Sequence, residues 1–132
     1  MKRLLNHSPK RQGAFSLIEL LLVIALFGIL AAIAGPRYIS YKQSAYDSRS
    51  QLDLRNGAAA EEAYFADNEI YFDCENDECL SMAGFQRSNA VEIEFSSNSG
   101  THLTGTAYSP LGNRNTLGAA YRWNSQSGGM QP

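Results

Sequence analysis

One carboxylate stands alone in a long apolar run near the amino terminus. Residues 15–34 read FSLIELLLVIALFGILAAIA, and Glu19 is the only ionisable side chain among them. At the centre of a membrane helix such a carboxylate costs on the order of 2.5–3.5 kcal/mol unless a positive charge neutralises it. The run contains no His, Cys or Asp that would assist catalysis. The chemistry that Glu19 offers is therefore charge pairing with a cation.

A second group of reactive side chains lies in the acidic stretch DCENDEC at residues 73–79. Its two cysteines, Cys74 and Cys79, predict one disulfide if the chain is exported and two thiols if it is cytosolic. Asp73, Glu75 and Asp77 alternate there and offer oxygens to Ca²⁺, but the stretch lacks the glycine and the terminal bidentate glutamate of a known calcium loop. A solvated acidic loop is the simpler interpretation, and we predict neither a metal site nor a cofactor.

The remaining side chains do not assemble into a catalytic pattern. The sequence has no glycine-rich phosphate loop, and His102 stands alone on a predicted strand. Residues 1–14 hold four basic residues and no acid, which leaves 7 basic and 13 acidic residues, a net charge of −6, in residues 15–132. A body this acidic offers no broad basic face to nucleic acid. We expect neither an enzyme nor a nucleic-acid-binding protein.

The apolar run is long enough to cross a membrane. As a helix, 20 residues span roughly 30 Å, about the thickness of the hydrocarbon core of a bilayer. Because basic residues precede the run and the acidic body follows it, the positive-inside rule puts the amino terminus in the cytoplasm and residues 37–132 outside, which favours the disulfide. A secretory signal cleaved after Ala34 is the alternative. The length of the run and the presence of Glu19 argue against that alternative.

The residues at the start of the run, GAFSLIEL at 13–20, resemble the processing site of type IV prepilins, in which a short basic leader precedes a Phe-[ST]-Leu-Ile-Glu-Leu sequence. The resemblance implies that a prepilin peptidase removes residues 1–14, cutting between Ala14 and Phe15, and methylates the new amino group of Phe15. The family usually has glycine directly before the cut, whereas this chain has Ala14. A cut after Gly13 would put Glu19 one residue too far along.

Cleavage before Phe15 would supply the cation that Glu19 lacks. The amine of Phe15 lies four residues before Glu19, so both groups share one face of a helix. In a bundle of such helices, Glu19 of one subunit neutralises the amine of a neighbour and sets the register between them. We interpret Phe15 and Glu19 as assembly residues. The alternative is that Glu19 only extends toward the membrane surface.

Three residues predict local weakness in the apolar helix. Gly28 interrupts it, and Gly35-Pro36 end or kink it because proline has no amide hydrogen. The resemblance suggests that this stretch loosens in a filament. The alternative is that Pro36 marks the exit from the membrane.

The rest of the chain predicts an α+β head, and the resemblance implies that this head has the type IV pilin fold. Residues 37–66 predict an amphipathic helix that continues the apolar one and turns an apolar stripe to the body. Alternation of side-chain types predicts strands at 91–95 and 117–123, and a run rich in threonine predicts one at 102–108. These strands would form an antiparallel meander against this helix, with a loose end from 124 to 132. The predicted stripe contains Tyr38, Tyr41, Ala45, Leu52, Ala59, Ala63 and Ala66, with Leu54, Ala58 and Phe65 beside it. The predicted sheet core contains Val91, Ile93, Phe95, Leu103, Ala107, Tyr121 and Trp123.

The resemblance also implies a function. By this resemblance the chain would be a structural subunit of a type IV pilus. Residues 15–35 would anchor it in the inner membrane, and the head, residues 36–132, would lie outside. Copies of the chain then polymerise into an extracellular filament for adhesion, twitching motility or attachment. The implied partners are further copies of the chain, the prepilin peptidase, and an assembly platform with its motor.

Alternatives remain open on the sequence alone. A pseudopilin of a type II secretion system, or a minor pilin, shares the amino-terminal third of the chain. A small secreted soluble domain follows if residues 1–34 are a signal peptide. Electron transport along aromatic side chains is a further alternative. Ordinary packing of side chains explains the presence of the same residues without it. These are Phe15, Phe27, Tyr38, Tyr41, Tyr46, Tyr64, Phe65, Tyr71 and Phe72.

Overall fold

The protein consists of two units that share one helix. The computed structural model describes residue 13, residues 15–98 and residues 100–131. Its contacts divide the chain between Arg37 and Tyr38 into an amino-terminal unit and the head. Helix α1 (Leu17–Asn68) belongs to both and contains Pro36 in its interior. Gly35-Pro36 were expected to end or kink the helix. They do not end it, because α1 continues through both residues, although Pro36 removes one backbone hydrogen bond from it. The kink remains a prediction.

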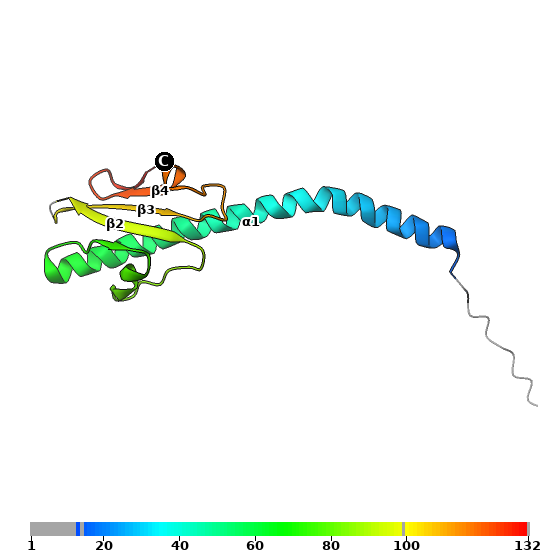
Figure 1. Ribbon diagram of the computed structural model, residues 1–132. Coiled ribbons are helices and arrows are strands. Elements are labelled where there is room, and N and C mark those ends of the chain that lie inside the picture. The colour runs from blue at the N-terminus through cyan, green and yellow to red at the C-terminus, as the bar shows by residue number, and fades with distance from the viewer. Residues whose placement is uncertain (1–12, 14, 99, 132) are drawn as a thin grey trace, which may run out of the picture. The chain divides into compact units, whose positions relative to one another are not determined.

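A five-stranded antiparallel sheet lies beside the carboxyl-terminal part of α1 (Figure 1). The strands lie side by side in the order in which they occur along the chain, so the sheet is the predicted meander. This arrangement confirms the predicted α+β fold, a long helix packed on a small antiparallel sheet. The strands are β1 (Cys74–Glu75), β2 (Glu92–Asn98), β3 (His102–Tyr108), β4 (Tyr121–Asn124) and β5 (Gly129–Gln131).

The carboxyl-terminal part of the sheet differs from the prediction. Leu117–Ala119 form a short 3₁₀ helix, η2, and only the end of the predicted strand pairs as β4. The predicted loose end contains β5, which pairs with β4. Gly128 and Gly129 make the reversal between these strands possible, because both adopt positive φ, +85° and +104°.

The core of the head lies between α1 and the inner face of the sheet. Ile93 and Phe95 of β2 are buried there together with Leu54 and Ala58 of the helix. The ring of Phe95 reaches the helix backbone at Gly57, where a β-carbon would lie only 2.4 Å from the ring. Five predicted core residues are fully buried, and Tyr121 and Trp123 pack against them partly exposed; the five are Val91, Ile93, Phe95, Leu103 and Ala107.

The face of α1 that meets the sheet is not the predicted apolar stripe, although it includes Leu54 and Ala58, which were predicted beside that stripe. All seven stripe residues are exposed, among them Tyr41 with 70% and Leu52 with 55% of their surface. The prediction was wrong because it equated apolar character with burial, whereas three acids of this helix, Asp47, Asp53 and Glu61, are buried with hydrogen-bond donors from the loops of the head. The buried residues of α1 are Asp47, Ser50, Asp53, Leu54, Gly57, Ala58, Ala60 and Glu61.

Candidate functional site

The start of α1 is fixed by a reciprocal pair of hydrogen bonds between Ser16 and Glu19. The backbone N–H and the hydroxyl of Ser16 each donate to Oε2 of Glu19 at 2.9 Å. The N–H of Glu19 donates back to the hydroxyl of Ser16 at 3.3 Å. This is a capping box, which satisfies amides that the first turn leaves without partners. The Ser-x-x-Glu spacing was present in the sequence, but our sequence analysis did not use it.

Phe15 lies directly before this cap and is 87% exposed. The structure thus places the predicted new terminus and Glu19 at the same end of the apolar helix. The other half of the predicted cleavage site, Ala14, lies outside the described residues, as do residues 1–12 of the predicted leader. Cleavage before Phe15 and its methylation therefore remain predictions.

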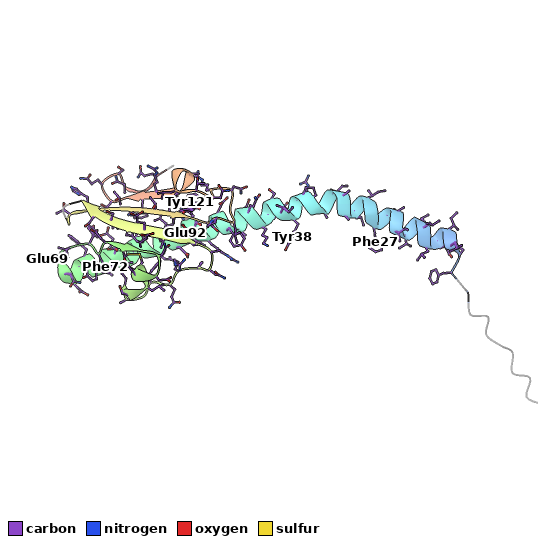
Figure 2. All side chains as sticks on the ribbon, in the orientation of Figure 1. Phe27, Tyr38, Glu69, Phe72, Glu92 and Tyr121 are labelled. Atoms are coloured by element: carbon purple, nitrogen blue, oxygen red, sulfur yellow. A yellow bond between two sulfur atoms is a disulfide. The ribbon has the colours of Figure 1, made fainter. Side chains whose placement is uncertain are left out.

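None of the residues that the structure describes covers the apolar part of α1. Its most apolar 18-residue window has a mean hydropathy of 2.8, and none of that window is buried. Figure 2 shows Phe27, 66% exposed, on a stretch of helix that no other element covers. Within the described part of the chain this is the one helix long and apolar enough to cross a membrane. Such a helix is stable in a bilayer or against other apolar helices, but not bare in water.

Gly28 and Gly35 lie on this uncovered stretch. A β-carbon at either position would meet no atom within 4 Å, so packing within one chain gives no reason for glycine there. Each glycine lowers helix stability by about 1 kcal/mol relative to alanine. The weak point predicted at Gly28, Gly35 and Pro36 remains a prediction.

Inside the head, three acids on the buried face of α1 hold three loops. Asp47 accepts hydrogen bonds from the backbone N–H groups of Asn113 and Arg114, at 3.2 and 3.1 Å. Asp53 accepts from the N–H of Ser88 at 2.7 Å and from its hydroxyl at 3.0 Å. The third acid, Glu61, accepts from a backbone N–H at 2.9 Å. These carboxylates fix the loops that frame the sheet, although the sequence predicted an apolar contact.

Glu61 is fully buried, and burial raises its pKa from the ordinary 4.5 to about 7. The N–H of Phe72 donates to its Oε2 at 2.9 Å and lowers the pKa, while Asp73 and Glu62 raise it by repulsion. Its Oε1 lies 4.0 Å from Sγ of Cys74. Because a disulfide sulfur carries no proton, any hydrogen bond across that distance is donated by the protonated carboxyl of Glu61.

The stability of the head is therefore expected to rise as the pH falls from 7.5 to 5.5. Between pH 4.5 and about 7 folded Glu61 keeps a proton that the unfolded chain has lost. The resulting stabilisation is complete below pH 4.5 and disappears as the pH rises through 7. Lowering the pH from 7.5 to 5.5 should therefore raise the free energy of unfolding by about 2 kcal/mol. Urea unfolding of the detergent-solubilised chain at several pH values measures it. Glu61→Gln is the control and should flatten this dependence; an equal dependence in both proteins would contradict the assignment.

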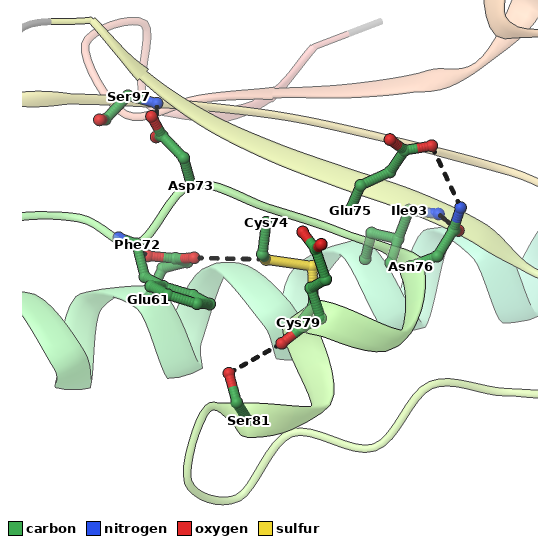
Figure 3. The surroundings of a disulfide bond; sticks show 11 residues. Glu61, Phe72, Asp73, Cys74, Glu75, Asn76, Cys79, Ser81, Ile93 and Ser97 are labelled. Carbon is green, nitrogen blue, oxygen red and sulfur yellow. Dashed lines mark hydrogen bonds between the residues drawn. A yellow bond between two sulfur atoms is a disulfide. The ribbon is translucent and has the colours of Figure 1, made fainter.

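Cys74 and Cys79 form a disulfide, as predicted for an exported chain (Figure 3). The bond closes a loop that contains Glu75 of β1 and most of the 3₁₀ helix η1 (Asn76–Ser81). Cys74 pairs with Phe95 at the outer edge of β2. The disulfide therefore fastens the two-residue strand that covers this edge.

Side chains of the same segment complete the cover of β2. Asp73 accepts a hydrogen bond from the N–H of Ser97 at 2.6 Å, and Asn76 accepts one from the N–H of Ile93 at 3.1 Å (Figure 3). An uncovered strand edge is a template for uncontrolled pairing with other chains. The acidic segment thus protects the sheet edge.

Removing the disulfide, by Cys74→Ser together with Cys79→Ser, is expected to destabilise the head by about 2 kcal/mol. The estimate is the loop-closure entropy of a six-residue loop; the edge of β2 also becomes free to pair. Urea unfolding and light scattering of the purified chain measure both effects. A reductant should lower the wild type to the level of the variant and leave the variant unchanged. A variant as stable as the wild type would contradict this role.

The oxygens of the acidic loop point to protein partners rather than to one centre. Asp73 binds the amide of Ser97, and Asp77 forms an ion pair with Arg87. Within the described ranges, no group of three potential metal-ligating side chains occurs. These contacts assign the loop a structural role.

The aromatic side chains form ring contacts at the end of α1. Tyr64 lies 5.6 Å from Phe72 and Phe65 lies 4.5 Å from Tyr71, centroid to centroid. Each pair joins the helix to the segment that leaves it, and such packing stabilises the exit.

Comparisons with known proteins match the chain to one family model and to several relatives. A family model for the prokaryotic N-terminal methylation motif matches residues 9–35. Fimbrial protein Q of Moraxella bovis is 33% identical over 111 residues, which are 78% of this chain and 71% of that protein. The type IV major pilin protein PilA of Myxococcus xanthus is 35% identical over 75 residues, or 57% of this chain.

A secretion protein also matches. Type II secretion system core protein G of Pseudomonas aeruginosa is 36% identical over 62 residues, which are 47% of this chain and 44% of that protein. The chain spans 34% of the length of PilA and 59% of the type IV major fimbrial protein FimA of Dichelobacter nodosus. The match to fimbrial protein Q reaches further, across most of both chains.

Proposed function

The chain belongs to the type IV pilin family, and we propose that it is a structural subunit of a type IV pilus. One observation carries the proposal: a folded head continues into an apolar helix that no described residue covers and that has a single carboxylate, Glu19, in its first turn. In the membrane, lipid covers this helix. In a filament, the same helices of neighbouring subunits replace the lipid.

The proposed route begins with the precursor in the inner membrane, its amino terminus in the cytoplasm. A prepilin peptidase cuts between Ala14 and Phe15 and methylates the amino group of Phe15. The terminal amine of one subunit then pairs with Glu19 of a neighbour as the helices pack, with the assembly platform and its motor driving extrusion. The opposite charges fix the register, because apolar helices alone can slide past one another.

The capping box gives Glu19 a defined starting position. Ser16 holds its carboxylate at the helix start, where the amides of the first turn favour a negative charge. The carboxylate is thus already ordered before a neighbour arrives. Gly28, Gly35 and Pro36 are the proposed weak point, at which the helix loosens when subunits pack or the filament is stretched.

A pseudopilin role is the second candidate, and the match to secretion protein G favours it. Both roles use the same anchor, cleavage and charge pair. They differ in the machinery that the chain needs, because a pseudopilin acts with type II secretion components. The match to fimbrial protein Q covers a larger share of both chains than the match to secretion protein G does, which favours the pilus role.

Expression of the full chain in two strains tests the proposal. One strain keeps pilus assembly genes and lacks type II secretion genes, and the other has the reverse. We expect the chain in filaments sheared from the first strain, visible by electron microscopy, and none after deletion of the prepilin peptidase. Filaments only in the second strain would favour the pseudopilin. Recovery of the chain only as soluble protein would contradict both roles.

A further inference from the structure

The charges of the head are divided between the two edges of its sheet. Residues 95–132 contain no acid, and their basic residues are Arg114 and Arg122. Residues 69–94 contain one basic residue, Arg87, and seven acids: Glu69, Asp73, Glu75, Asp77, Glu78, Glu92 and Glu94. Because the strands lie in chain order from β1 to β5, this division runs across the sheet from one edge to the other.

Four of these acids surround one hollow at the β1 edge of the sheet. We call Asp73, Glu75, Glu78 and Glu94 the acidic margin; all four are exposed, and together they line a hollow of about 230 Å³. Glu75 of β1 lies directly opposite Glu94 of β2. Like charges placed in this way on neighbouring strands are destabilising.

The acidic margin has no cation of its own in the described part of the chain. Asp73 accepts a hydrogen bond from the N–H of Ser97 at 2.6 Å, and Glu75 accepts one from the amide of Asn76 at 3.3 Å, but both donors are neutral. The one ion pair among the described residues joins Arg87 to Asp77, and neither of them lines the hollow. A cation supplied from outside would relieve the repulsion.

Arg122 is an exposed cation near the opposite edge. Its neighbours across the sheet are Thr106 of β3 and Gln131 of β5, both neutral. Trp123 packs against the core, so the side chain of Arg122 points to the outer face. Only β5 separates it from the edge, and a strand is about 4.8 Å wide, which an arginine side chain can reach across.

Arg114 lies beside the same edge. Its guanidinium is 4.4 Å from the ring of Tyr121, the first residue of β4. Strand β5 pairs only with residues 122–124, so β4 has no further strand beside it at Tyr121. We call Arg114 and Arg122 the basic margin. A guanidinium is planar and can donate to two carboxylates at once, which suits the acidic margin.

A contact between opposite sheet edges leaves α1 free to pack on other helices. The helix lies on the inner face of the sheet (Figure 1), so copies that meet edge to edge keep each sheet outside its own helix. The exposed face of α1, which includes Tyr41 and Leu52, stays open to neighbouring helices. Because the two edges differ, the contact is head to tail and can continue from copy to copy in a filament.

We propose that Arg122 of one subunit binds the acidic margin of a second copy of this chain, with Arg114 beside it. This inference rests on the proposed function, because it describes how the heads meet around the packed helices. The contact supplies a cation to four carboxylates that have none. Complementary charges of this kind also select the correct relative position of the two heads.

Charge reversal tests the contact in cells that assemble filaments of the wild-type chain. Arg122→Glu and Glu78→Arg are each expected to reduce sheared filaments by about tenfold or more, and the double variant is expected to restore them to within about threefold of wild type. Both side chains are exposed, so the urea unfolding curve of each single variant should match wild type. The matched control is Thr104→Glu, which adds an acid on the outer face of the central strand and should keep the wild-type filament yield.

Cross-linking provides a second readout. Lys42 is the one lysine beyond residue 14, so Arg122→Lys keeps the charge and adds a single new lysine to the processed chain. A carbodiimide that joins an amine directly to a carboxylate should then give filaments a covalent dimer that wild-type filaments lack. Peptide mapping should place the link between residue 122 and an acid of the acidic margin.

The outcomes separate the two proposals. Single charge-reversal variants with wild-type filament yield would overturn the contact and leave the pilus role intact. Arg122→Lys filaments without a new dimer, or with residue 122 joined to other carboxylates, would also overturn the contact. Absence of filaments from the wild type itself would overturn the pilus role and the contact together.

Discussion

Replacing Glu19 with glutamine is expected to abolish filament assembly while the chain remains in the membrane. The substitution removes the negative charge that is proposed to neutralise the amine of Phe15 in a neighbour. An amine left unpaired among apolar helices costs about 3–5 kcal/mol, so the yield of sheared filaments should fall on the order of 100-fold or more. Immunoblots of sheared and membrane fractions measure both pools.

Glutamine also separates the two roles of Glu19. Its amide oxygen still accepts the hydrogen bonds of Ser16, so the capping box survives. Ser16→Ala is the complementary control, because it loses the hydroxyl but keeps the charge, at a cost of about 1 kcal/mol to the helix start. It should still assemble filaments. Normal filaments from Glu19→Gln would contradict the pairing. Failure of Ser16→Ala as well as Glu19→Gln would indicate that assembly needs the cap in addition to the charge.

Replacing Asp47 with alanine is expected to destabilise the head by about 3 kcal/mol. Its carboxylate accepts hydrogen bonds from two backbone amides and from Nδ2 of Asn113, and it is 9% exposed. Alanine would leave these donors without a partner, and each such loss costs about 1–3 kcal/mol where the group stays buried. Urea unfolding of the purified chain in detergent measures the difference.

The matched control for Asp47 is Asp67, which belongs to the same helix but is exposed. Asp67→Ala should change the free energy of unfolding by less than about 0.5 kcal/mol. If Asp47→Ala were as mild as this control, the three hydrogen bonds would not hold the loop of residues 113–114, and the buried acids of α1 would need another explanation.

The parts of the fold that follow from local patterns were predictable. Strands β2 and β3 alternate apolar and polar residues because one side of each is buried, and that alternation is visible in the sequence. Strand β5 was missed because its glycine and polar residues are held by pairing with β4, a contact that no local pattern reveals. The segment 117–119 was misread because small side chains made a helical turn resemble an alternating strand.

The buried face of α1 was not predictable from the helix alone. Asp47, Asp53 and Glu61 are buried because backbone amides of distant loops donate to them, and the positions of those loops depend on the finished fold. Glu19 was different. Its isolation in an apolar run marks it in the sequence, and the structure adds its bond to Ser16.

The intact mass and amino-terminal sequence of the chain recovered from sheared cell-surface filaments test the central claim most directly. We predict a chain that begins at Phe15 with one methyl group on its amino nitrogen and retains the Cys74–Cys79 disulfide. A chain that begins at Gly35 and occurs only in soluble extracts would contradict the account, because the apolar helix proposed to build the filament would then have been discarded.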